Sequence, residues 1–139
     1  MLVLGLDPSL TNFGWALHDD TLKGADRCPA RGRFKTPSKM VFIDRYCYMR
    51  ESLKDLIQQY QPDAIGIEYP VFNDLWSEGM YGLFLYSCEA LRDEGADVVF
   101  FSPMQVKAHA RLSLDRPKGW KMLKGDMVDA AKEDCGGKG

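Results

Sequence analysis

The stretch GLDPSLTNFGWAL, from Gly5 to Leu17, places a carboxylate and a polar turn inside sequence that is otherwise typical of buried strands. One apolar run, Leu2 to Leu6, leads into it, and a second, Phe13 to Leu17, ends it. Two apolar runs joined by a short polar turn predict a hairpin. Asp7 then stands at the tip of a buried strand, where an unpaired carboxylate is costly. Either it hydrogen-bonds its own turn or it binds a metal ion.

The rest of the chain alternates between strand and helix patterns, which predicts an α/β fold. Ser38 is a candidate N-cap, and apolar residues such as Ile43, Cys47 and Leu53 recur at helical spacing after it. The expected elements are an edge strand over 32–35, helices over 39–60 and 77–93, buried strands over 64–67 and 97–101, a helix opened by 102–103, and a helix over 125–134. The expected architecture is a mixed β-sheet, with antiparallel hairpin strands plus parallel strands, and helices on both faces. At 139 residues, we expect a single domain over 1–139.

Composition is that of an ordinary globular protein, with 45% hydrophobic and 27% charged residues. No apolar run approaches the ~18 residues of a transmembrane helix, and the N-terminus lacks the basic flank of a signal peptide. We therefore expect no membrane partner. The four cysteines lie far apart without a Cys-x-x-Cys motif, which argues against zinc and favours free thiols in a reducing cytoplasm.

Basic residues gather in two stretches, although the formal net charge is −2. The first spans residues 27–39 and holds no acid, and the second spans residues 104–125 with a single acid. Together they predict one cationic surface suited to nucleic acid, whereas either stretch alone is more typical of a solvated loop or helix face. The residues that we expect to contact DNA phosphates are Arg31, Arg33, Lys35, Lys107, Lys118 and Lys121.

Two apolar strands each end in one acid, Asp7 in the first and Glu68 in the second. If these strands are neighbours, both carboxylates project into one crevice at the edge of the sheet. Two close carboxylates repel unless a cation lies between them, and oxygen ligands favour Mg²⁺ or Mn²⁺. Such a site suits hydrolysis of a phosphodiester. The alternative is that both acids merely cap turns.

Several short motifs in the right order resemble RuvC-type Holliday-junction resolvases. They are GLDPSLTNFGWA at residues 5–16, Asp44-Arg45, QPDAIGIE at residues 61–68 and FFSPMQVK at residues 100–107. The resemblance runs from Met1 to about Ala131. It implies a ribonuclease H-like fold, a homodimer and divalent-metal cleavage of four-way DNA junctions in a bacterial cytoplasm, with a phage-type member as the nearest form.

The resemblance also implies roles for individual residues. Asp7 and Glu68 match the first two metal-binding acids, and Lys107 and Lys124 match basic residues beside the scissile phosphate, so Lys124 joins the acids as a catalytic candidate. An aromatic residue after the second acid enters the junction in this family. Phe72 is the first candidate here, ahead of Tyr69 and Trp76, with core packing as its alternative.

The family's last metal ligands are a carboxylate pair on a late helix, which here would fall beyond Gly139. Asp126 and Asp129 are spaced to share one helix face and could replace that pair, but we expect them to face solvent and the last helix to be missing. The leading hypothesis is a crossover junction endodeoxyribonuclease. The alternative is a catalytically incomplete module that binds junction DNA. A phosphotransferase or ATPase domain of the same superfamily comes last, because the turn over residues 8–12 has no glycine.

Overall fold

The computed structural model describes residues 1–68, 78–117, 125–127 and 129–130. Its elements follow the predicted order of three strands and then alternating helices and strands. The strands are β1 (Leu2–Asp7), β2 (Asn12–Asp19), β3 (Arg31–Lys35), β4 (Ala64–Glu68) and β5 (Val98–Phe101). The helices are α1 (Phe42–Tyr60), α2 (Glu78–Asp93) and α3 (Pro103–Ser113), with the 3₁₀ turn η1 (Gly24–Arg27) before β3. Residues 125–127 and 129–130 are also helical, within the predicted 125–134 segment.

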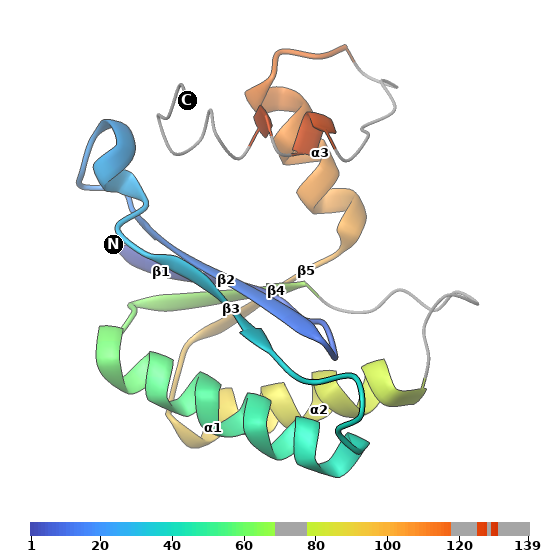
Figure 1. Cartoon of the computed structure of the whole chain (residues 1–139). Helices are drawn as coiled ribbons and strands as arrows, with labels where there is room; N and C mark the ends of the chain where they lie inside the picture. Colours follow the sequence, from blue (N-terminus) through green and yellow to red (C-terminus); the bar gives the residue numbers. More distant parts are fainter. Residues whose placement is uncertain (69–77, 118–124, 128, 131–139) are drawn as a thin grey trace.

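The five strands form one mixed sheet in the order β3-β2-β1-β4-β5. β1 pairs with β2, and β2 with β3, in antiparallel fashion, whereas β1–β4 and β4–β5 are parallel pairs. Helices α1 and α2 cover one face of the sheet, and α3 lies over the other (Figure 1). The predicted mixed sheet with helices on both faces is confirmed.

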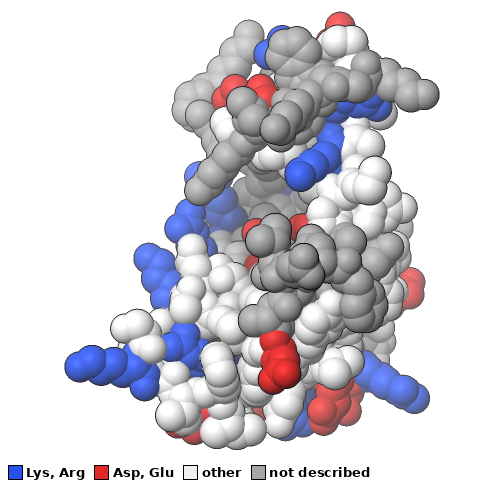
Figure 2. All heavy atoms as spheres, turned by 90° about the vertical axis from the view of Figure 1, so that its right-hand side faces the viewer, with Lys and Arg blue, Asp and Glu red and all other residues white. Residues whose placement is uncertain are grey.

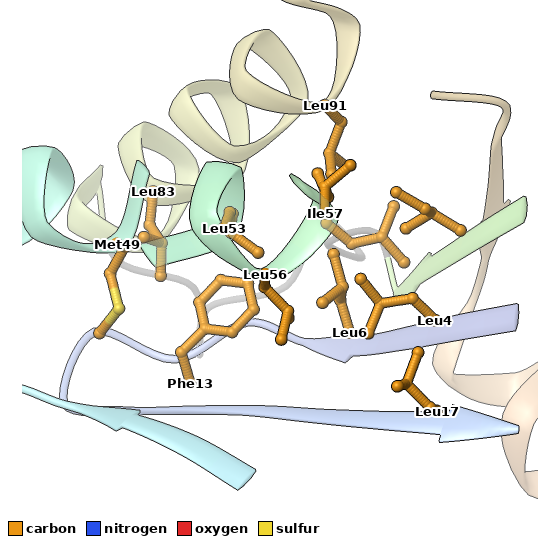
Figure 3. Close-up of a cluster of buried hydrophobic side chains, with 12 residues drawn as sticks. Leu4, Leu6, Phe13, Leu17, Met49, Leu53, Leu56, Ile57, Leu83 and Leu91 are labelled. Atoms are coloured by element: carbon orange, nitrogen blue, oxygen red, sulfur yellow. The ribbon is translucent and has the colours of Figure 1, made fainter. Parts of the chain in front are cut away.

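The hydrophobic core fills the space between the sheet and the α1–α2 pair (Figure 3). Because strand side chains alternate between faces, every second residue of the central strands points into this layer. The strand side chains of the core are Leu4, Leu6, Phe13, Leu17, Ile65 and Ile67, and the helical ones are Met49, Leu53, Leu56, Ile57, Leu83 and Leu91.

The opposite face of the central strands carries mostly small residues. Gly5, Gly14, Ala16 and Gly66 alternate with the core residues of their strands. A Cβ built on Gly66 would lie 3.0 Å from the ring of Phe101, so the aromatic side chain rests on this glycine. The face is therefore shallow, and Asp7 and Glu68 stand at its end.

Three local predictions were wrong. Ser38 does not cap α1: the helix begins at Phe42, its N-cap residue is Val41, and no side-chain capping bond forms. Ile43 is 54% exposed and Cys47 is exposed, because the buried stripe of α1 runs instead through Arg45, Met49 and Leu53. Strand β5 was expected to be buried, but it lies at the edge of the sheet and its side chains are largely exposed.

The cysteines depart from the expectation of free thiols. Cys28 is disulfide-bonded, whereas Cys47 and Cys88 are free. Burial raises the pKa of the Cys88 thiol. Within the part of the chain that the structure describes, no helix is both long and apolar enough to cross a bilayer.

Candidate active site

Asp7 and Glu68 end two adjacent parallel strands. Gly5 of β1 pairs with Gly66 of β4, and Leu6 with Ile67, so the next step along both strands brings Asp7 beside Glu68. Paired residues of parallel strands point to the same face, about 5 Å apart. The two carboxylates therefore meet at the carboxyl edge of the sheet, on the face opposite α1 and α2.

The two carboxylates have raised pKa values. Desolvation raises the pKa of Asp7. Desolvation also raises the pKa of Glu68, the charge of Asp7 raises it further, and Lys107 lowers it. Two partly desolvated carboxylates that repel each other are stabilised by a cation between them. The geometry accordingly favours the metal-binding interpretation of both residues.

The alternative interpretation of Asp7 as a turn cap is not supported. The residues of its own turn are all described, and none of them donates a hydrogen bond to its carboxylate; the turn instead closes through Asn12 N, which donates to Ser9 Oγ at 3.4 Å. The carboxylate of Asp7 is left available for a ligand.

A buried arginine holds that turn in place. Thr36 Oγ1 donates to the carbonyl oxygen of Leu10 at 2.7 Å, and Arg45 Nη1 donates to Thr36 Oγ1 at 3.1 Å. The same guanidinium donates from Nε to the Met40 carbonyl at 2.8 Å and from Nη2 to the Ser38 carbonyl at 2.7 Å. Arg45 thus ties the turn after Asp7 to the loop after β3 and to α1. The sequence offered one signal for this role, an arginine in the Asp44-Arg45 motif at a helix position that proves to be buried.

Lys107 approaches the acids from α3. A capping box starts this helix: Gln105 N donates to Ser102 Oγ at 3.1 Å, and Ser102 N donates to Gln105 Oε1 at 2.8 Å. The box fixes where α3 begins, directly after β5, whose Phe101 pairs with Glu68, and this places Lys107 on the first turns of a helix that starts beside Glu68. The structure therefore brings together three of the predicted site residues.

The basic residues of β3 point to the same face as Asp7. Arg31, Arg33 and Lys35 are exposed and alternate with Gly32 and Phe34. Seen from the carboxyl edge, basic side chains line one side of a recess that holds carboxylate atoms (Figure 2). One part of the predicted cationic surface, the basic residues of β3, therefore lies on the same face as the paired acids.

No third metal ligand joins the pair within residues 1–68, 78–117, 125–127 and 129–130. Those residues contain no group of three or more His, Cys, Asp or Glu side chains able to hold a metal ion, so neither Asp126 nor Asp129 completes the site. The other predicted site residues lie outside the described residues. They are Phe72, with Tyr69 and Trp76 as its alternatives, and Lys118, Lys121 and Lys124.

The fold is ribonuclease H-like. The structure of Thermus thermophilus RuvC in complex with a Holliday junction substrate superposes with a TM-score of 0.79 at 20% identity, covering 100% of this chain and 82% of that one. The yeast mitochondrial Holliday junction resolvase Ydc2 superposes with a TM-score of 0.61 at 13% identity, covering 96% of this chain and 76% of that one.

Within that fold class, the sequence is similar to the crossover junction endodeoxyribonuclease RuvC. The protein of that name from Rickettsia typhi is 37% identical over 73 residues, which are 52% of this chain and 46% of the relative. The Rickettsia felis protein is 38% identical over 74 residues, again 52% and 46%. The chain spans about half the length of the curated relatives it matches. No protein-family model matches it. The predicted resemblance to RuvC-type resolvases is confirmed over about half of the chain.

Proposed function

We propose that this chain is a divalent-metal-dependent endonuclease that cleaves four-way DNA junctions. The observation that carries the proposal is the placement of Asp7 and Glu68 side by side at the ends of adjacent parallel strands, with Lys107 close to Glu68. The similarity to proteins named as junction endonucleases supports it.

Asp7 and Glu68 are the residues that would hold Mg²⁺ or Mn²⁺, with a third carboxylate from outside the described residues. An ion held there would supply Lewis-acid chemistry, that is, polarisation of a phosphate and a lower pKa for a water molecule. Lys107 neutralises charge on the phosphate, and Lys124 is proposed to assist it. The turn held by Arg45 keeps the Asp7 carboxylate in place at the end of β1.

DNA binding is proposed to extend from the acids over the basic residues of β3 and of the second basic stretch. Arg31, Arg33 and Lys35 contact backbone phosphates on one side, while Lys118 and Lys121 contact them on the other. Such contacts release counterions, so affinity falls steeply with salt. Phe72 is proposed to enter the junction. By the same resemblance, we propose that the active form is a homodimer that works in the bacterial cytoplasm. The chain would then be a phage-type member of the family.

A second candidate function is a module that binds junctions without cutting them. The observation in its favour is that no cluster of three metal-ligating side chains forms among the described residues. The two candidates share the DNA surface and differ only in catalysis.

The test is incubation with a labelled synthetic four-way junction in Mg²⁺ or Mn²⁺, with a linear duplex of the same sequence beside it. We expect symmetric nicking of the junction that falls at least about a thousandfold in Asp7→Asn, equivalent to about 4 kcal/mol of transition-state stabilisation. The matched control is Asp55→Asn, which removes an exposed carboxylate from α1 and should cut like the wild type. Tight, salt-sensitive binding without nicking would establish the module instead. Neither binding nor nicking would refute both candidates.

A further inference from the structure

One row of residues runs across the sheet at the level of the two acids. Arg33 of β3 pairs with Gly14 of β2, and Gly14 pairs with Asp7 of β1. Glu68 lies one residue beyond Ile67, which pairs with Leu6. Cross-strand partners share a face. Arg33 therefore points to the same face as the acids and is separated from Asp7 by a single residue that has no side chain.

Gly14 leaves the surface beside Asp7 without a side chain, and its backbone conformation does not require glycine. Its φ lies outside the positive range that favours glycine, and a Cβ at this position would lie 3.6 Å from the Cβ of Asp7. Any longer side chain would occupy the surface between Arg33 and the carboxylate. The glycine keeps that passage open.

Among the basic residues of β3, Arg33 is the one that lies directly across Gly14 from Asp7. Two strand spacings, about 10 Å, separate the backbones of β3 and β1, a span that an extended arginine and a bound phosphate can bridge together. Arg31 lies one row further from the acids and faces Ala16, which has a methyl group, in place of Gly14. Arg33 forms no ion pair with any described residue, and its planar fork suits bidentate phosphate binding.

We propose that Arg33 reaches across Gly14 and binds the phosphate next to the scissile one in the strand that is cut. The inference rests on the proposed function, because it takes Asp7 and Glu68 as the centre that receives the scissile phosphate. Arg33 then sets the register of the strand in the site, in addition to adding general affinity for DNA.

The test replaces single phosphates of the junction by neutral methylphosphonates on either side of the cleaved bond. Binding is measured in Ca²⁺ for the wild type and for Arg33→Gln, Arg33→Lys, Arg31→Gln and Gly14→Ala. A charge-assisted bidentate contact is worth about tenfold or more in affinity. We expect a methylphosphonate at one flanking position to lower the affinity of the wild type about tenfold. The same methylphosphonate should not lower the affinity of Arg33→Gln any further. Arg31→Gln should bind more weakly but keep the wild-type sensitivity at that position.

Gly14→Ala tests the need for an open surface between Arg33 and Asp7 while the charge of Arg33 is kept. Its new methyl group would make ordinary van der Waals contact with Asp7, so the variant should fold, which its melting curve checks. We expect it to lose the same sensitivity as Arg33→Gln although Arg33 is intact, and Arg33→Lys to keep only part of the sensitivity.

The outcomes separate this inference from the function beneath it. If the wild type binds junctions but Arg33→Gln retains full sensitivity at both flanking phosphates, the inference is wrong and the proposed function stands. If Gly14→Ala retains the sensitivity, the passage over Gly14 is not the route. A wild type that binds no junction overturns the proposed function and this inference together.

Discussion

The two faces of one sheet are built from alternate residues of the same strands, yet they do different work. β1 contributes Leu4 and Leu6 to the packed layer under α1 and α2, and Gly5 and Asp7 to the face under α3 (Figures 1 and 3). The first face is closed by large apolar side chains. The second is shallow and ends in carboxylates flanked by cations. The alternation of a strand thus separates stability from chemistry, and each face can be changed without rebuilding the other.

The packed face should show the largest effect on stability. Leu53 is fully buried at the centre of the α1 stripe, and Leu53→Ala removes its contacts and leaves a cavity, which costs about 3 kcal/mol. Urea unfolding measures the loss. The matched control is Leu85→Ala on α2, where the side chain is 65% exposed and the expected change is within about 0.5 kcal/mol. Equal losses at the two positions would contradict the packing described for this face.

Arg45 links the two faces, and its loss should have the next largest effect. Its guanidinium lies on the packed side but holds the turn that follows Asp7, through Thr36 and the Leu10 carbonyl. Arg45→Gln removes charge-assisted bonds to three carbonyl groups and should lower the free energy of unfolding by about 2 kcal/mol. Arg45→Lys keeps the charge without the fork and should lose less.

The effect of Arg45→Gln on cleavage distinguishes a positioning role from a purely structural one. At temperatures where the variant is fully folded, we expect a lower single-turnover rate with junction affinity retained, because the turn beside Asp7 loosens while the basic surface stays intact. A folded variant with the wild-type rate would show that Arg45 serves stability alone.

The sequence was sufficient to predict the order of the elements and the residues at which the strands end. Apolar runs predicted four of the five strands, and the alternation of charged and aromatic residues predicted β3. The two acids were expected to meet if their strands were neighbours, which the sheet order confirms. The sequence could not show that β5 is an edge strand, because a run of apolar residues reads alike at the edge and at the centre. It also could not show that Arg45 is buried, because its partners are carbonyl oxygens, which every residue carries.

The alignment of Arg33, Gly14 and Asp7 across three strands likewise could not be predicted from the sequence. It depends on the register of two strand pairs, and register changes face with every single-residue shift. In the sequence, Gly14 is only one residue of a motif. Its position between Arg33 and Asp7 follows from the pairing of β2 with β3 on one side and β1 on the other.

The face that carries the acids should show the smallest effect on stability, and with the opposite sign. In the metal-free protein, the pKa of Asp7 is raised by desolvation, and the pKa of Glu68 is raised by desolvation and by the charge of Asp7. A carboxyl whose folded pKa exceeds its unfolded value costs stability at neutral pH. That cost disappears as the pH falls through the raised folded pKa toward the unfolded value. Asp7→Asn should therefore be more stable than the metal-free wild type at pH 7, by less than about 1 kcal/mol because the side chain is partly solvated.

The difference between wild type and Asp7→Asn should shrink as the pH is lowered toward 4, since protonation relieves the wild type of the same repulsion. Unfolding in urea with EDTA at pH 7 and at pH 4.5 measures this difference. The exposed Asp19, whose pKa is lowered by hydrogen bonds from Thr21, contributes equally to both proteins, so its contribution cancels. Millimolar Mg²⁺ or Mn²⁺ should stabilise the wild type and leave Asp7→Asn nearly unchanged, because only the native wild-type site binds the ion. A wild type that exceeds Asp7→Asn in stability at pH 7 without metal would mean that the Asp7 carboxylate is already neutralised by the protein, and that the site does not need a cation.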